Sequence, residues 1–177
     1  TKDGFGAIGH VDICYKGRII SFGNYDTNSE RLFGTMGDGV LFSADREKYI
    51  EFCKRENHKT LLGYGLALSP EQLAAIDKEI AKLMSLTVPW DPPKTVKPKR
   101  PGIDKEEPMY AYKLKQEADA RLYKFTSSKF KTYFVMSTNC VLLADTIVGA
   151  AGTDILSVRG FISPGTYQDY LDKEFER

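Results

Sequence analysis

The sequence predicts an α+β fold in which antiparallel strands pack against helices. Three observations lead to this prediction. Residues 10–22 alternate around Lys16-Gly17, a pattern typical of a β-hairpin. Residues 69–84 carry a strong helix-start signal followed by a helical apolar stripe. A strand-like run at 131–137 then precedes a second, strongly apolar helix pattern.

The composition bounds the class of protein. The chain has 177 residues, 42% hydrophobic and 28% charged, which favours one domain with a continuous core over residues 1–177. A formal net charge of +1 argues against nucleic acid as the partner. No apolar run approaches the roughly 20 residues of a membrane span. Because the first residues lack both an initiator Met and a signal peptide, we expect a mature form or an excised domain.

The first hairpin predicts how its side chains are shared between two faces. His10, Asp12 and Cys14 alternate along one face of the first strand, and apolar residues occupy the other. Residues 23–42 are turn-rich and glycine-rich, and we expect a surface loop there. A helix is then predicted from a Ser43 cap to about Glu56.

The middle of the chain is predicted to be an insertion around 43–107. It contains a strand at 60–69 and a helix that Ser69 caps, with Pro70 and Gln72 in its first turn. Five of the eight prolines lie in 88–102, which indicates an extended connection.

The last third of the chain predicts three further elements. Residues 109–125 are expected to be helical in part, and 131–137 to form a strand. The helix that begins near Cys140 should close at Gly149 or Gly152. Ser163-Pro164 is then expected to open a short terminal helix.

Cys140 stands at the start of a helix, after Ser137, Thr138 and Asn139, any of which is able to cap it. A helix N-terminus carries partial positive charge and unpaired N–H groups, which stabilise a thiolate and hold an oxyanion. Free cysteine is also a common core residue, so position alone leaves both interpretations open. Cys53 lies on the apolar side of a helix and is expected to be core.

A nucleophilic Cys140 needs a base, and the chain offers only His10 and His58. His58 falls in a charged turn, where solvent exposure is expected. His10 opens a strand on its polar face, so it is the better candidate. A lone strand histidine is nevertheless more often structural than catalytic.

The third polar group, which would orient the imidazole, has several candidates. The returning strand of the hairpin places Ser21 and Asn24 near His10, and the hairpin register decides between them. Asp12 is the less favoured candidate, because two residues along an extended strand span about 7 Å.

These motifs resemble a known family. The segment "GHVDICYKGRIISFG" looks like the histidine hairpin of NlpC-type papain-like peptidases, and "TNCVLLADTIVGAAG" looks like their cysteine helix. The order with His before Cys resembles the circularly permuted branch, which includes YiiX-like amidases and lecithin–retinol acyltransferase-like enzymes. The residues "ISPGTYQDYL" resemble a segment that often closes these domains. Residues 25–125 match nothing in the family, and Ser21 or Asn24 departs from its usual His, Glu or Gln.

The resemblance implies a permuted papain-like fold and a cysteine hydrolase. Cys140 would attack a carbonyl, His10 would move the proton, and N–H groups at the helix start near Asn139 would hold the oxyanion. It implies no metal and no organic cofactor. The expected substrate is a peptide amide, above all a bacterial cell-wall (peptidoglycan) stem peptide, in an extracytoplasmic or secreted setting.

Two other functions remain open from the sequence. The same Cys–His pair serves lipid acyltransferases and phospholipases, which should carry an exposed apolar patch or amphipathic segment beside the site. Residues 25–125 show no strong example of one. The third possibility is a catalytically inactive binding module with the same cleft.

Overall fold

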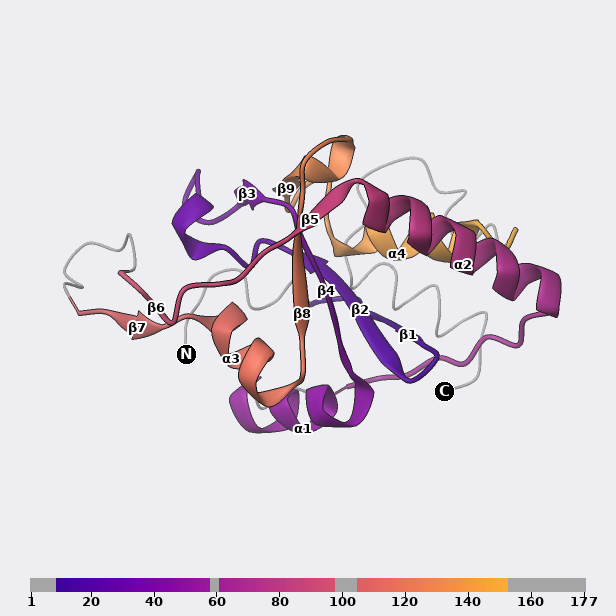
Figure 1. Ribbon diagram of the computed structural model, residues 1–177, viewed down its shortest axis with the longest axis horizontal. Coiled ribbons are helices and arrows are strands. Elements are labelled where there is room, and N and C mark those ends of the chain that lie inside the picture. The colour runs from indigo at the N-terminus through magenta and orange to yellow at the C-terminus, as the bar shows by residue number, and fades with distance from the viewer. Residues whose placement is uncertain (1–8, 58–60, 98–104, 153–177) are drawn as a thin grey trace.

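A computed structural model of the chain describes residues 9–57, 61–97 and 105–152 (Figure 1). Its main sheet is antiparallel and has five strands in the order β1-β2-β4-β8-β5. These strands are β1 (Ile13–Tyr15), β2 (Arg18–Gly23), β4 (Val40–Asp45), β8 (Arg121–Phe125) and β5 (Thr87–Pro89). Two small ladders join β3 (Met36–Asp38) to β9 (Thr132–Phe134), and β6 (Thr95–Val96) to β7 (Glu107–Pro108). The α+β class predicted from the sequence is confirmed.

Helices cover both faces of the main sheet (Figure 1). They are α1 (Arg46–Asn57), α2 (Pro70–Ser85), α3 (Tyr110–Glu117) and α4 (Cys140–Gly149), with short 3₁₀ turns η1 (Thr27–Ser29) and η2 (Lys129–Lys131). The central strand β4 shows how helices can cover both faces of the sheet. Val40 and Phe42 pack towards α1 and α3, while Leu41 between them packs towards α2 and α4. Alternate residues of one strand therefore enter two separate cores.

The predicted hairpin is confirmed. Strands β1 and β2 pair with Tyr15 opposite Arg18, so Lys16 and Gly17 form a two-residue turn. Their φ angles are 48° and 74°, as a type I′ turn requires, and glycine adopts such angles without strain. The helix start at Ser69 is confirmed as well. Its hydroxyl accepts from the Gln72 backbone N–H, and the Gln72 side chain accepts from the Ser69 N–H.

The prediction for residues 23–43 is wrong in two respects. Ser43 lies inside β4, and Asp45 caps α1 by accepting from the N–H groups of Glu47 and Lys48. The glycine-rich segment contains β3 and the start of β4 rather than a loop throughout. Gly39 is required by packing, because a Cβ there would collide with the backbone carbonyl of Phe130.

Several predictions for the rest of the chain need correction. Residues 61–69 form neither helix nor strand, although a strand was expected at 60–69. The connection at 88–97 includes the short strands β5 and β6. The expectation that residues 109–125 are helical in part is confirmed, because α3 ends at Glu117 and β8 follows. The predicted terminal helix at 162–175 lies outside the described residues. In the described part of the chain, no helix is both long and apolar enough to cross a membrane.

Candidate active site

The first turn of α4 positions Cys140. Asn139 caps this helix, because its Oδ1 accepts from the N–H of Leu142 at 3.2 Å. Its amide nitrogen donates to the carbonyl of Val135 at 3.0 Å, which fixes the chain before the helix. Cys140 itself is 3% exposed and packs with Val11 at the edge of the sheet. The helix start therefore lies directly against the segment that carries His10.

His10 contacts both the cysteine and a carboxylate. Its ring lines the same cleft as Cys140, and the two groups shift each other's pKa, upward for His10 and downward for Cys140. Its Nε2 lies 2.8 Å from Asp12 Oδ1. The structure thus brings Cys140, His10 and Asp12 into one continuous chain of polar contacts.

Asp12 is the third polar group of this chain, in contrast to the distance expected from strand geometry. The expectation of about 7 Å holds for an extended strand. Here β1 and its ladder begin only at Ile13, so residues 10–12 lie before the paired strand. Residues 10 and 12 therefore escape strand spacing, and their side chains meet.

The Asp12 carboxylate is held from a second side. Tyr49, on α1, donates to its Oδ2 at 2.8 Å. Its Oδ1 is buried without a well-aligned hydrogen bond, and the His10 ring faces it at 2.8 Å. An ionised carboxylate in such a place depends on the positive charge of the imidazolium.

Two hydroxyl groups complete the surroundings of His10 Nε2. Ser21 Oγ lies at 2.8 Å and Tyr25 Oη at 3.1 Å, and the two hydroxyls contact each other at 2.7 Å. The Tyr25 ring lies over Gly23, where a Cβ would stand 2.8 Å from a ring carbon. Glycine at 23 thus allows the Tyr25 hydroxyl to reach the site. Ser21, a predicted site residue, contacts His10 as expected.

Asn24, the other predicted orienting residue, does not contact His10. Its side-chain amide donates to the carbonyl of Met36, and its oxygen accepts from Ser29. It lines the cleft and supports the neighbouring loop. Cys14 is exposed, Cys53 is buried in the core on α1, and His58 lies outside the described residues.

The pKa directions agree with an ion pair between Cys140 and His10. Burial lowers the pKa of His10, but the charge and hydrogen bond of Asp12 outweigh it, and the pKa stands well above its ordinary 6.5. Burial raises the pKa of Cys140, yet the hydrogen bond and charge of His10 and the N–H of Val11 bring it below 9.0. Burial also raises the pKa of Asp12, and the charge of His10 reverses this to below 3.8. All three shifts favour the charged forms, which are thiolate, imidazolium and carboxylate.

A cleft of about 270 Å³ opens over these groups. Its lining residues are Gly9, His10, Gly23, Asn24, Tyr25, Glu30, Gly34, Thr35, Tyr133, Val135, Asn139 and Cys140. The nucleophile candidate and His10 therefore both lie in the wall of one open cleft.

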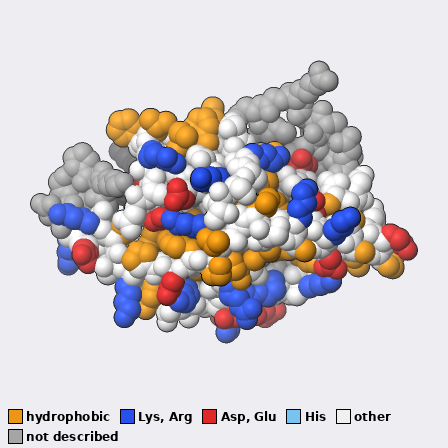
Figure 2. Space-filling view, turned by 45° about the horizontal axis from the view of Figure 1, so that its top comes forward, with side chains coloured by type: hydrophobic (Ala, Val, Ile, Leu, Met, Phe, Trp, Pro, Cys, Tyr) orange, Lys and Arg blue, Asp and Glu red, His pale blue; other side chains and the backbone are white. Residues whose placement is uncertain are grey.

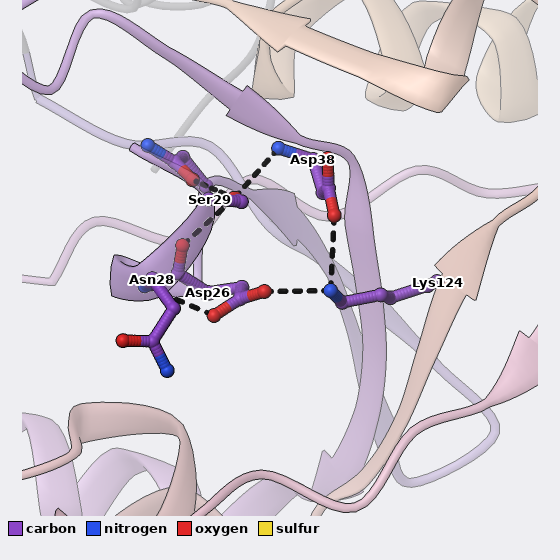
Figure 3. Close-up of polar contacts among 6 residues, drawn as sticks. Asp26, Asn28, Ser29, Asp38 and Lys124 are labelled. Atoms are coloured by element: carbon purple, nitrogen blue, oxygen red, sulfur yellow. Dashed lines mark hydrogen bonds and ion pairs between the residues drawn. The ribbon is translucent and has the colours of Figure 1, made fainter. Parts of the chain in front are cut away.

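The loop from Tyr25 to Asp38 forms one wall of the cleft, and a lysine from β8 holds it (Figure 3). Lys124 Nζ lies 2.6 Å from Asp26 Oδ2 and 3.0 Å from Asp38 Oδ2. Ser29 adds a second connection, because its hydroxyl donates to the Asp26 carbonyl and accepts from the Asp38 N–H. These contacts join the two ends of the loop to the main sheet.

Sequence reasoning missed Tyr25 and Tyr49 and underrated Asp12. Asp12 had a signal, since it is the acidic residue nearest His10. Tyr25 and Tyr49 had none, because long-range packing brings them to the site.

Within the described ranges, no group of three or more His, Cys, Asp or Glu side chains is arranged to hold a metal ion. Comparison with models of protein families, with curated proteins and with solved structures finds no match for this chain.

Proposed function

We propose that this protein is a cysteine hydrolase of the circularly permuted papain-like type, with Cys140 as nucleophile, His10 as general acid and base, and Asp12 as the orienting carboxylate. The observation that carries the proposal is the Cys140–His10–Asp12 chain of contacts at the start of α4, inside a cleft. The order of His10 before Cys140 and the resemblance of both motifs support the permuted type.

The proposed reaction begins with attack of the Cys140 sulfur on an amide carbonyl carbon. The carbonyl electron pair moves to oxygen, and N–H groups in the first turn of α4 stabilise the oxyanion. The intermediate then collapses, and the C–N bond breaks as the His10 imidazolium gives its proton to the departing amine. The acyl group remains on Cys140 as a thioester.

Water completes the cycle. Neutral His10 takes a proton from the water molecule, whose oxygen attacks the thioester carbonyl. The carbon–sulfur bond breaks, the carboxylic acid leaves, and Cys140 returns as thiolate beside imidazolium. Asp12 stays ionised throughout and stabilises the positive charge of the ring.

The proposed substrate is a peptide amide, with a peptidoglycan stem peptide as the first choice on the resemblance. An ester or thioester lipid is the second candidate. It is favoured by one observation, the exposed side chains of Leu32 and Phe33 next to the cleft wall. A catalytically inactive binding module is the outcome that the tests below would reveal.

The first test measures thiol reactivity, which needs no knowledge of the substrate. Iodoacetamide at neutral pH should label Cys140 faster than the exposed Cys14 and the buried Cys53, as read by peptide mass spectrometry. The His10→Ala variant should lose this preference. Equal labelling of Cys140 in both proteins would contradict the proposed pair.

The second test measures turnover on stem peptides, aminoacyl amides and p-nitrophenyl esters. Cys140→Ala and His10→Ala should each lower kcat/KM by on the order of 10³-fold or more. Hydrolysis of amides with little ester preference supports the peptidase, and turnover of long-chain esters alone supports the lipid enzyme. Full activity in both variants would refute the mechanism.

A further inference from the structure

The turn between η1 and β3 exposes two large apolar side chains. Leu32 is 62% exposed and Phe33 102% exposed, so the phenyl ring lies wholly in solvent. Figure 2 shows hydrophobic side chains gathered at the upper left edge of the molecule, over the segment between η1 and β3. We call Leu32 and Phe33 the apolar tip.

The backbone holds this tip in a fixed shape. Arg31 and Met36 form an isolated β-bridge, with N–H to carbonyl distances of 2.9 and 3.3 Å in the two directions. Thr35 closes the turn, because its N–H and its hydroxyl both donate to the Leu32 carbonyl. The tip is therefore presented by a hydrogen-bonded turn.

The same turn is strained. Leu32 and Phe33 have φ angles of 48° and 57°, a region that large side chains seldom adopt. Neither side chain gains burial within the described part of the chain that would offset this strain. A contact outside the molecule is the natural compensation, because exposed apolar groups at a strained position are unfavourable for the isolated fold.

The tip lies at the mouth of the candidate active site. Gly34 and Thr35, the next two residues, line the cleft. The Thr35 carbonyl accepts from the N–H of Val135, and the adjacent Met136 is 53% exposed. Whatever the tip binds is thereby brought to the cleft opening.

Cationic side chains accompany the tip. Arg31 stands at its base, and Lys129 and Lys131 are exposed on η2, at the other end of the β3–β9 ladder, where Thr132 pairs with Asp38. Figure 2 shows Lys and Arg side chains directly beside the hydrophobic group. Of the acidic side chains in this region, Asp26 and Asp38 are paired with Lys124 (Figure 3), and Glu30 lies beside Gly34 on the cleft side of the turn. An apolar tip with basic neighbours matches the layers of an anionic bilayer surface.

We propose that the apolar tip docks this protein on an anionic lipid bilayer. Leu32 and Phe33 enter the interfacial region, and Arg31, Lys129 and Lys131 face the headgroups. A bilayer suits the tip better than a protein partner or a second copy, because a stable protein interface buries about 800 Å² on each side. Two protruding side chains supply only a small part of that area, whereas a fluid bilayer can accommodate the insertion of two side chains alone.

Sedimentation with vesicles tests the proposal. The wild type should bind vesicles of phosphatidylcholine and phosphatidylglycerol in equal parts, and bind pure phosphatidylcholine more weakly. The Leu32→Ser/Phe33→Ser variant should lower the partition coefficient by about tenfold or more. Replacing Arg31, Lys129 and Lys131 by Gln should lower binding to the mixed vesicles only.

Two controls keep the test independent of folding and of catalysis. Leu61→Ser/Leu62→Ser removes two exposed apolar side chains, 46% and 42% exposed, from the segment between α1 and α2, and its binding should equal that of the wild type. Cys140→Ala removes the proposed nucleophile and should also bind normally. Thermal unfolding of the tip variant should match the wild type, because the replaced side chains are in solvent.

Three results would overturn the proposal. The first is a wild type that does not sediment with either vesicle. The second is a tip variant that binds as well as the wild type. The third is a wild-type oligomer in sedimentation velocity that the tip variant dissociates, which would assign the tip to a second copy of the chain.

Discussion

Three oxygen atoms surround Nε2 of His10, and they have different consequences. Asp12 supplies charge, which stabilises imidazolium, whereas Ser21 and Tyr25 supply neutral hydroxyls. A charge-assisted contact is about twice as strong as a neutral one. Asp12 is therefore the group on which the state of His10 depends most, and the hydroxyls serve to confine the ring.

Replacing Asp12 should show this dependence. Asp12→Ala is expected to slow alkylation of Cys140 and to lower kcat/KM by about 10²-fold or more, since the imidazolium loses its counter-charge. Asp12→Asn should recover part of the activity, because an amide oxygen still orients the ring. Asp119→Ala, which removes an exposed carboxylate paired with Arg18, is the matched control and should change neither rate. Equal loss in the Ala and Asn variants would point to charge alone.

The pH dependence follows from the two opposite shifts. The pKa of Cys140 is lowered from 9.0, so its thiolate forms at lower pH than in a free cysteine. The pKa of His10 is raised from 6.5, so its proton persists to higher pH. Alkylation of Cys140 should therefore rise at lower pH than alkylation of a free cysteine, and it should not fall again at higher pH. Turnover should fall again when His10 loses the proton that the leaving group needs.

The contrast between these two profiles is measurable in one protein. His10→Ala should move the alkylation midpoint of Cys140 to higher pH. Cys14, labelled in the same samples, reports the behaviour of an exposed cysteine. Turnover and alkylation curves that decline together at high pH would speak against His10 as the acid.

At the scale of elements, the N-terminus of α4 links stability to chemistry. Asn139 caps the helix and also holds the carbonyl of Val135, so one side chain sets both the helix start and its approach. The helix itself is largely buried and apolar, which makes it a rigid support for Cys140. Its predicted beginning at "NC" reflects local capping chemistry.

Asn139→Ala should cost about 1 kcal/mol in the free energy of unfolding, and it should also slow alkylation of Cys140. Ser69→Ala removes the cap of α2 and should cost a similar amount without affecting Cys140. Urea unfolding and alkylation rates, measured side by side, separate the two effects. If both variants slowed alkylation equally, global stability alone would explain the loss.

At the scale of the whole molecule, Lys124 joins segments that are far apart in the sequence. Its ammonium group on β8 lies between Asp26 and Asp38, at the two ends of the cleft wall. It also lies 5.0 Å from the centre of the Trp90 ring. The Lys124 side chain is 25% exposed and that of Asp26 9% exposed, so water screens this contact less than a surface pair.

Lys124→Met should destabilise the protein by about 1–3 kcal/mol, because it leaves Asp26 buried without its cation. We expect KM to rise more than kcat falls, since the cleft wall loosens while Cys140 and His10 keep their contacts. Adding Asp26→Asn should restore part of the stability. Lys16→Met, which breaks an exposed pair with Asp77, should cost about 0–1 kcal/mol. Similar losses in the two lysine variants would show that burial does not strengthen the cluster.

Features that depend on residues close together in the sequence were predictable, and features that depend on distant residues were not. The Lys16-Gly17 turn, the Ser69 capping box and the start of α4 depend on residues a few positions apart, and they were predicted correctly. Strand β4 was missed although it is central, because its glycine-rich approach is typical of a loop. The same glycines allow close packing, as Gly39 does against Phe130.

The sequence by itself determined which cysteine stands at a helix start, because helix capping depends on neighbouring residues. It also limited the candidate base to two histidines, because the chain contains no others. Only the tertiary structure decided that Asp12 faces His10, that Tyr25 and Tyr49 reach the same site, and that Leu32 and Phe33 stay exposed. Those outcomes depend on where the chain leaves regular strand geometry and on which distant helix packs against it. No spacing rule within one segment contains that information.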